Sequence, residues 1–371
     1  MNPWHSLPRP IIGLAPMDAI TDHPFRHITK KYGNPDIVYT EFTSVEALCH
    51  GDWHSLRNFI YDESQRPIIA QIYGRTPQYF RQVAIMLCEL GFDGIDINMG
   101  CPAKTVANGG CGAGLIRTPD NAQAIVQAAK AGVEDWCNGA TTAQCTRLLA
   151  RFAKHVAARH AELPAKYQQR MPIPVSVKTR IGYDRPAVEQ WIPRLLEVEP
   201  VAICLHGRTL HQAYKGQADW DAIGTAAQLC RQTSTMILGN GDATSRLDAQ
   251  RRAATYDLDG VLIGRASYGN PFVFQLIETE EEETQSTKPP SRPQMIRIAL
   301  EHVRLFEETY QRLEHYHFPA MRKHLSWYIK EIPGATHIRA SLMQTKSAQE
   351  VEAVFQQQEQ RSLAFRRLIH E

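Results

Sequence analysis

The sequence predicts an α/β protein, a (β/α)8 TIM barrel followed by a C-terminal all-helical domain. Eight short apolar and β-branched runs recur along the chain, each ending in Gly, Pro or a polar residue. Such near-continuous apolar runs are typical of parallel strands that are buried on both faces. Stretches of helical character, such as Thr76–Leu90 and Ser245–Tyr256, separate most of the runs. This alternation of strands and helices indicates a barrel. After the last strand-like run, the sequence shows only helical periodicity, which indicates a helical domain.

The eight runs define the predicted strands. A doubly wound open sheet is the alternative, but it requires a Gly-x-Gly-x-x-Gly pattern after the first strand, and the sequence has none there. In chain order, the strands are Ile11–Met17, Ile37–Phe42, Ile68–Gly74, Gly94–Gly100, Val175–Gly182, Ala202–Thr209, Met236–Asp242 and Gly260–Ala266.

The connection between the fourth and fifth strands is too long for one βα unit of roughly 30 residues. We therefore expect an insertion at about 134–171, with an extra helix around Thr142–Ala161. We expect this insertion to be a surface elaboration of the barrel.

Residues 278–289 read ETEEEETQSTKP, an acidic and then Pro-containing segment that predicts a linker. It separates a barrel domain at 1–277 from a helical domain at 290–371. Helical patterns in the second domain cover Met295–Leu313, Pro319–Lys330 and Ala348–His370.

Composition excludes several classes of protein. With 371 residues and 43% hydrophobic content, the chain is not wholly disordered. A net charge of +2 excludes a globally basic nucleic-acid binder, but it conceals +3 in 1–277, −4 in the linker and +3 in 290–371. The near-zero total therefore leaves room for local basic surfaces.

Eight cysteines without any Cys-x-x-Cys spacing favour a reducing compartment and give no zinc pattern, so we expect no metal. The first residues show no basic region followed by a long apolar region, so we expect no signal peptide, and no run of about 18 apolar residues occurs. We expect a cytoplasmic protein with no membrane partner, and a monomer.

Polar and reactive side chains gather where the predicted strands end, which is where barrel enzymes carry their sites. One such residue alone can be structural, but a set at the same end of seven strands indicates a site. The set consists of Met17, Gln71, Asn98, Cys101, Lys178, Arg180, His206, Arg208, Asn240 and Arg265.

The last two strands end in Gly239–Asp242 and Gly264–Ala266. Loops at these positions of a barrel often bind phosphate, since glycines let backbone N–H groups approach and an Arg adds charge. We expect a phosphorylated ligand there.

Two side chains leave alternatives open. Lys178 is costly to bury without an anionic partner, so it can serve a Schiff base or stabilise a reduced, anionic flavin. Cys101, between Gly100 and Pro102 at a strand end, can act as a general acid, or as a nucleophile if its pKa is lowered. His206 and Gln71 can bond the edge of a flat heterocycle.

These motifs, taken together and in order, resemble the tRNA-dihydrouridine synthases, and look closest to the bacterial B-type branch. The resemblance covers about residues 8–345 and departs from the family in the insertion. Its motifs are Ala15–Met17, Ile97–Pro102, Val177–Arg180, His206–Thr209, Gly239–Asp242, Ile263–Ala266 and, in the helical domain, Arg322–Tyr328.

The resemblance implies tightly bound FMN, reduced by NADPH, and a tRNA uridine reduced to 5,6-dihydrouridine. Cys101 would be the catalytic acid. The cofactor-binding residues implied are Pro16, Met17, Gln71, Lys178, His206, Asn240, Gly241, Asp242, Gly264 and Arg265. Asn98 would fix the uracil.

A uridine in folded tRNA must be extruded to reach a pocket, and cations on both domains can contact the RNA backbone. The substrate-binding residues expected beside Asn98 are Lys104, Arg180, Arg208, Arg322 and Lys323, and further candidates for backbone contacts are Lys215, Lys330 and Arg339. Three rivals remain: a flavin barrel that reduces a free pyrimidine or an enone, a Schiff-base aldolase using Lys178, and an RNA-binding module on a barrel without activity.

Overall fold

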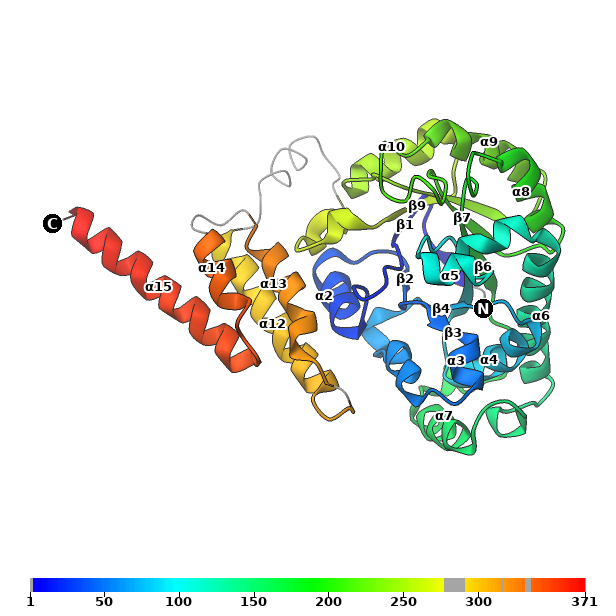
Figure 1. Ribbon diagram of the computed structural model, residues 1–371, viewed down its shortest axis with the longest axis horizontal. Coiled ribbons are helices and arrows are strands. Elements are labelled where there is room, and N and C mark those ends of the chain that lie inside the picture. The colour runs from blue at the N-terminus through cyan, green and yellow to red at the C-terminus, as the bar shows by residue number, and fades with distance from the viewer. Residues whose placement is uncertain (1–2, 277–290, 315, 331–334, 371) are drawn as a thin grey trace. The chain divides into compact units, whose positions relative to one another are not determined.

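A computed structural model describes residues 3–276, 291–314, 316–330 and 335–370, without the side chains of Lys104, Glu359 and 361–370. The predicted linker at 278–289 lies outside the described residues. The described part forms one parallel sheet of nine strands, in the order β1-β9-β8-β7-β6-β5-β4-β2, with β3 also on β4 (Figure 1).

The strands confirm the predicted fold class. Each predicted run contains a strand. The second run contains β2, and a further short strand, β3, follows directly after that run; both pair with β4. The strands are β1 Ile11–Leu14, β2 Val38–Tyr39, β3 Thr43–Ser44, β4 Ile68–Tyr73, β5 Gly94–Met99, β6 Val175–Arg180, β7 Ala202–His206, β8 Met236–Asn240 and β9 Gly260–Ile263.

Backbone hydrogen bonds between β1 and the chain just before β2 close the sheet into a barrel. Leu14 N donates to Ile37 O at 3.0 Å, and Asp36 N donates to Ile12 O at 2.9 Å. The Asp36 carboxylate also accepts from Ile12 N at 2.7 Å. Closure removes the free sheet edges, which would otherwise expose unpaired backbone groups.

The barrel interior is divided into an apolar layer and a polar layer along the strands. Near the strand starts, Ile11, Ile69, Ala202 and Met236 pack in one buried cluster with Trp4. Toward the strand ends, inward positions carry polar residues instead, which places them together because alternate residues of a strand point to the same face.

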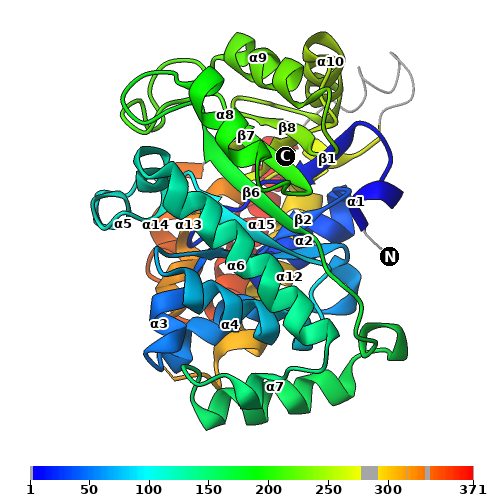
Figure 2. The same ribbon diagram turned by 90° about the vertical axis from the view of Figure 1, so that its right-hand side faces the viewer.

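Helices surround the barrel, and α4 and α6 run side by side (Figure 2). A Cβ at Gly132 of α6 would lie 2.2 Å from Arg81 O of α4, so glycine is required for this close approach. The helices of this unit are α1 Pro3–Ser6, α3 Val45–Cys49, α4 Pro77–Glu89, α5 Lys104–Asn108, α6 Pro119–Cys137, α7 Ala150–Glu162, α8 Val188–Leu196, α9 Trp220–Cys230 and α10 Arg246–Tyr256.

The insertion lies beside α4. Its helix α7 starts at Ala150 rather than Thr142, and a short 3-10 turn, Thr142–Gln144, precedes it. Tertiary bonds account for the later start, because Glu89 accepts from both Thr142 N and Oγ1, at 2.7 and 2.6 Å, and Arg147 N donates to Gln82 Oε1 at 2.8 Å.

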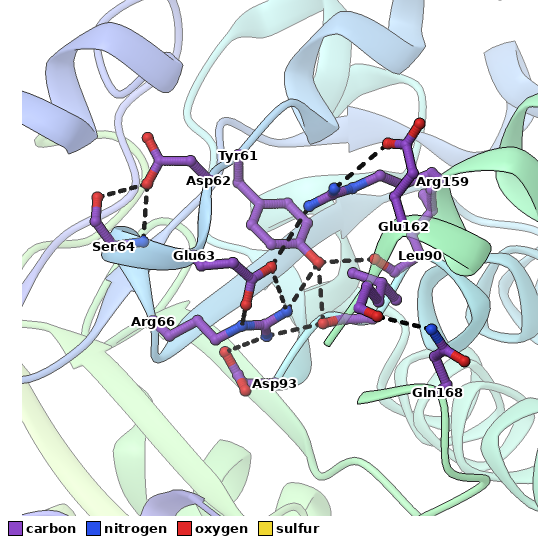
Figure 3. A network of polar contacts seen from close by, with 12 residues as sticks. Tyr61, Asp62, Glu63, Ser64, Arg66, Leu90, Asp93, Arg159, Glu162 and Gln168 are labelled. Carbon is purple, nitrogen blue, oxygen red and sulfur yellow. Dashed lines mark hydrogen bonds and ion pairs between the residues drawn. The ribbon is translucent and has the colours of Figure 1, made fainter. Parts of the chain in front are cut away.

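A polar network around Arg66 fixes the end of the insertion to the barrel (Figure 3). Arg66 pairs with Asp93 at 3.0 Å and donates to Tyr61 Oη at 3.1 Å, while its guanidinium lies 3.4 Å from the centre of the Tyr167 ring. Arg66 and Asp93 directly precede β4 and β5, so this network lies at the N-terminal ends of the strands. The insertion is therefore anchored at the end of the barrel opposite the predicted site.

The chain divides into two compact units, 1–21 with 35–264 and 22–34 with 265–371. The boundary differs from the predicted 1–277, since the helical unit begins at Arg265 and includes α2, His23–Gly33. The other helices of this unit are α12 Arg292–Tyr310, α13 Arg322–Tyr328, α14 Ala335–Leu342 and α15 Ala348–His370.

Helix α2 belongs to the helical unit because of its packing. Asp22 caps it by accepting from Phe25 N at 2.9 Å. Ile28 joins the core of α12 to α15, and Glu301 of α12 accepts from both Lys31 and Tyr32, at 2.6 and 2.7 Å. Among the described residues, no helix is long and apolar enough to cross a membrane.

Candidate active site

Five of the predicted site residues lie on consecutive strands at the C-terminal end of the barrel. In register, Asn98 of β5 pairs with Lys178 of β6, and His206 of β7 pairs with Asn240 of β8. Gln71 of β4 is hydrogen-bonded to Asn98 at 3.1 Å. The fold therefore brings together side chains that are as far as 169 positions apart in the sequence.

Asn98 holds the loop that carries Cys101. Its Oδ1 accepts from Gly100 N at 3.0 Å and from Cys101 N at 2.9 Å. Cys101 is 9% exposed, and burial raises the pKa of its thiol, with nearby Asp18 adding to the effect and Arg180 opposing it. The thiol is therefore protonated at neutral pH, which suits a general acid and not a thiolate nucleophile.

Lys178 is held by the amide of Asn240. Its Nζ donates to Asn240 Oδ1 at 3.0 Å, and Asn240 Nδ2 donates to Leu262 O at 2.8 Å, which fixes the direction of the amide. Burial lowers the pKa of Lys178. A partly buried cation thus faces the end of the barrel, where a bound anion would be stabilised.

Asp96 is a polar residue of this layer that sequence reasoning missed. It lies on β5, is fully buried, and accepts from Gln71 Nε2 at 2.7 Å and from Ser176 Oγ at 2.6 Å. Burial raises its pKa to about 6, against the opposing effects of Ser176, Gln71 and Lys178. The sequence contains a pattern that could have identified Asp96. It precedes Asn98 by two positions, so its side chain points to the same face of the strand.

Small or half-buried residues follow β1, β8 and β9. Gly241 has φ of +131°, a conformation that favours glycine. At Gly264, an added Cβ would meet Met17 Sδ at an ordinary 3.5 Å. Met17 and its neighbour Pro16 are half-buried.

The residues present fit a flavin phosphate. Gly241 and Gly264 carry no side chain at the ends of β8 and β9, which suits a close approach of phosphate to the backbone, while Lys178 and the spare donor and acceptor of Gln71 suit an anionic heterocycle. Among the described residues, no group of three or more His, Cys, Asp and Glu side chains could hold a metal ion.

Arg180 and Arg208 are not the surface cations that the sequence suggested. Both are buried, at 3% and 2% exposed. Arg180 donates to Gly100 O at 2.6 Å and to Thr209 O at 3.1 Å, and burial lowers its pKa to about 10. Sequence spacing gave their position at strand ends correctly but could not reveal that backbone carbonyls already occupy the guanidinium groups.

Arg208 and Asp242 form an internal pair at 2.7 Å. Arg208 also donates to Gly216 O at 2.6 Å and lies 3.4 Å from His206 Nε2. Asp242 was predicted as a phosphate neighbour, and its carboxylate is instead shared by Arg208 and by Ala218 N, which donates to it at 2.8 Å.

The remaining predicted residues belong to the helical unit or have side chains that the structure does not describe. Arg265 is exposed and opens the 3-10 turn Arg265–Ser267 in the helical unit. Arg322 donates twice to Thr345 O, at 3.1 and 2.9 Å, and Lys323 is half-buried. The Lys104 side chain lies outside the described residues.

The fold and the polar layer define the class of protein, a TIM-barrel enzyme with its site at the C-terminal ends of the strands. Residues 13–141 and 149–364 match the family model described as dihydrouridine synthase (Dus). The chain therefore belongs to the dihydrouridine synthase family, and the gap in the match at 142–148 falls within the insertion.

Curated relatives agree with this assignment over nearly the whole chain. A probable tRNA-dihydrouridine synthase of Staphylococcus epidermidis is 34% identical over 354 residues, 94% of each chain. Probable tRNA-dihydrouridine synthase 2 of Bacillus subtilis is 33% identical over 367 residues, 98% of each chain. Among solved structures, a DHODH from Eimeria tenella is similar at 14% identity, with a TM-score of 0.46, covering 71% of this chain and 78% of that one.

Proposed function

We propose that the protein reduces the C5–C6 double bond of uridines in tRNA to 5,6-dihydrouridine. The dihydrouridine synthase family match and the names of the curated relatives support the reaction and the substrate. The observation that carries the chemistry is the buried, protonated Cys101 held beside the polar layer by Asn98.

The cofactor in this proposal is FMN, held by Pro16, Met17, Gln71, Lys178 and His206 along its ring, with Asn240, Gly241, Gly264 and Arg265 near its phosphate. Asp242 takes an indirect part, because its carboxylate is bonded to Arg208. The chemistry that FMN supplies when bound is transfer of a hydride from NADPH to C6 of the uracil ring.

The protein's own side chains then complete the reduction. Cys101 holds a proton for C5, and its raised pKa keeps that proton in place through neutral pH. Asn98 retains two amide hydrogens, of which one is used by Gln71, so the other is available for a uracil carbonyl. The Lys178 cation favours the reduced, anionic state of the ring system.

The target base is extruded from the folded tRNA, so that RNA backbone and protein meet over a wide surface. Exposed Lys215 on the barrel unit and exposed Lys330 and Arg339 on the helical unit are our candidates for phosphate contacts, together with Lys104 and Lys323. Arg180, Arg208 and Arg322 act through the loops that they hold. Because the proposed substrate is tRNA, we place the enzyme in the cytoplasm. We also propose that it is a monomer.

An assay with the purified full-length chain tests this function. With FMN, NADPH and an unmodified tRNA transcript, we expect dihydrouridine, detected as a nucleoside heavier than uridine by two hydrogens. Protein that stays colourless after saturation with FMN would contradict the flavin chemistry and favour a Lys178 aldolase. Equal turnover of free uridine would favour a small-molecule reductase.

A further inference from the structure

Asp96 anchors a line of hydrogen bonds that ends at Cys101. Its Oδ2 accepts from Gln71 Nε2 at 2.7 Å. Gln71 Oε1 accepts from Asn98 Nδ2 at 3.1 Å. Asn98 Oδ1 accepts from Gly100 N and Cys101 N, at 3.0 and 2.9 Å. We call Asp96, Gln71 and Asn98 the amide relay.

The relay has a direction, and Asp96 sets it. An ionised carboxylate only accepts hydrogen bonds, so Gln71 must turn its NH2 group toward Asp96 and its oxygen toward Asn98. Asn98 must then turn its own NH2 toward Gln71, which leaves its oxygen facing the loop. The loop offers two N–H donors, so this orientation is the one in which every member is satisfied.

Nothing in the two amides themselves fixes this orientation. An amide group has nearly the same shape when its nitrogen and oxygen are exchanged. If residue 96 could donate as well as accept, Gln71 and Asn98 could both turn over. The NH2 of Asn98 would then face the N–H groups of Gly100 and Cys101 and leave two buried donors without an acceptor.

Burial raises the pKa of Asp96 to about 6, and two hydrogen-bond donors and a cation oppose that effect, so Asp96 is in its accepting state at neutral pH. Gln71 on β4 and Ser176 on β6 both donate to it. The titratable groups that face it from the packed strands are Tyr39 of β2, Lys178 of β6 and Cys204 of β7. Of these, Lys178 contributes a positive charge, and the other two are neutral because burial raises the pKa of each.

We propose that Asp96 is a positioning residue of the reaction: it fixes the orientation of Gln71 and Asn98 and thereby holds the Cys101 loop in place for proton transfer. This inference rests on the proposed function for the role of Cys101. Asp96 itself touches neither the cofactor nor the base in this account. The orientation of the two amides is a property of the protein alone and can be measured without turnover.

The test compares Asp96→Asn with wild type as FMN-loaded enzyme. Asparagine keeps the shape of the side chain but can donate, so it removes the direction of the relay. Hydrogen exchange by mass spectrometry of the peptide spanning Gly100 and Cys101 should accelerate by roughly ten-fold or more, because both amides lose their acceptor. Reoxidation of the NADPH-reduced enzyme by tRNA should slow by about 10- to 100-fold.

Two further variants separate direction from general damage. Asp93→Asn makes the same substitution just before β5, where Asp93 accepts from Ile68 N and Arg66, and should leave exchange at the loop unchanged. Asp96→Asn combined with Gln71→Glu restores an accepting group toward Asn98, so the loop should regain its protection from exchange.

The outcomes distinguish the two proposals. Wild-type exchange at Gly100 and Cys101 in Asp96→Asn would overturn the inference, as would equal acceleration in Asp93→Asn or the absence of rescue in the double variant. If the wild type fails to reduce tRNA while the exchange results are as expected, the relay stands and the proposed function falls.

Discussion

Asp242 accepts two hydrogen bonds from one nitrogen of Arg208, Nη2, at 2.9 and 2.7 Å. Two residues that the sequence suggested for RNA and phosphate contacts thus neutralise each other inside the barrel unit. The pair ties the loop after β7 to the loop after β8. We therefore expect these two residues to hold the two loops in place rather than to offer their charges to a ligand.

This pairing predicts how tRNA binding responds to salt. Replacing an exposed phosphate-binding cation reduces the slope of log affinity against log salt by about one. Lys215→Ala should do so, while Arg208→Met should leave the slope unchanged and lower the free energy of unfolding by about 1–3 kcal/mol. A reduced slope in Arg208→Met, measured by titration at several salt concentrations, would show that Arg208 contacts the RNA.

The network in Figure 3 predicts the stability of the barrel unit. Arg66 and Asp93 are both about nine-tenths buried, and removing one member of a buried pair costs about 3–5 kcal/mol. Arg66→Ala should show such a loss in urea unfolding. The pair of exposed Arg81 and half-buried Asp135 provides the control, since Arg81→Ala should cost about 1 kcal/mol or less. Equal losses in the two variants would refute this account of the insertion's anchor.

Two buried histidines predict that the helical unit is sensitive to acid. Burial lowers the pKa of His302 to about 3, and lowers that of His324 well below its usual 6.5. The unfolded chain therefore binds more protons than the folded unit once the pH falls below about 6.5. Folding stability should decline with falling pH, by about 2 kcal/mol for each imidazole between pH 7 and pH 5.

Thermal unfolding of His324→Leu and of the control His337→Leu measures this effect, since His337 is exposed on the same unit. The first variant should lose part of the decline between pH 7 and pH 5, and the second should keep all of it. The same pH dependence in His324→Leu as in wild type would assign the acid sensitivity to other groups.

Lys178 predicts a shift in the potential of the bound flavin. Removing a cation that stabilises the reduced anion by about 1–3 kcal/mol lowers a two-electron potential by about 20–60 mV. Lys178→Met should show this drop in a redox titration, and the exposed Lys166→Met on the insertion should not. An unchanged potential in Lys178→Met would mean that the cation does not act on the ring.

The sequence predicts the barrel well because a buried strand consists of apolar residues that are adjacent in the sequence. Each of the eight predicted runs contains a strand. It also places Gln71, Asn98, Lys178, His206 and Asn240 at the same end of the barrel, since parallel strands all point the same way. The side-chain partners of Arg180, Arg208 and Asp242 depend on loops that meet only after folding, so charge alone was misleading there.

The division of the chain could not be predicted for a related reason. Helix α2 follows β1 in the position of a barrel helix, yet its partners are Glu301 and the core of α12 to α15. Contacts between segments some 270 positions apart leave no local pattern. Asp96 was overlooked because it is a single acidic residue within an otherwise apolar predicted strand. The two-residue repeat of a strand nevertheless places its side chain on the same face as that of Asn98. The assignment to the B-type branch stays a prediction.

The central claim is that Cys101 is the acid that completes reduction of a tRNA uridine, and one measurement tests it most directly. Cys101→Ala is loaded with FMN, reduced with NADPH, and mixed with unmodified tRNA while flavin absorbance is followed. We expect reduction by NADPH and binding of tRNA to be as in wild type, and reoxidation by tRNA to be slower by roughly 100- to 10,000-fold, the range for loss of a general acid. Reoxidation by tRNA at the wild-type rate, with dihydrouridine formed, would contradict the account.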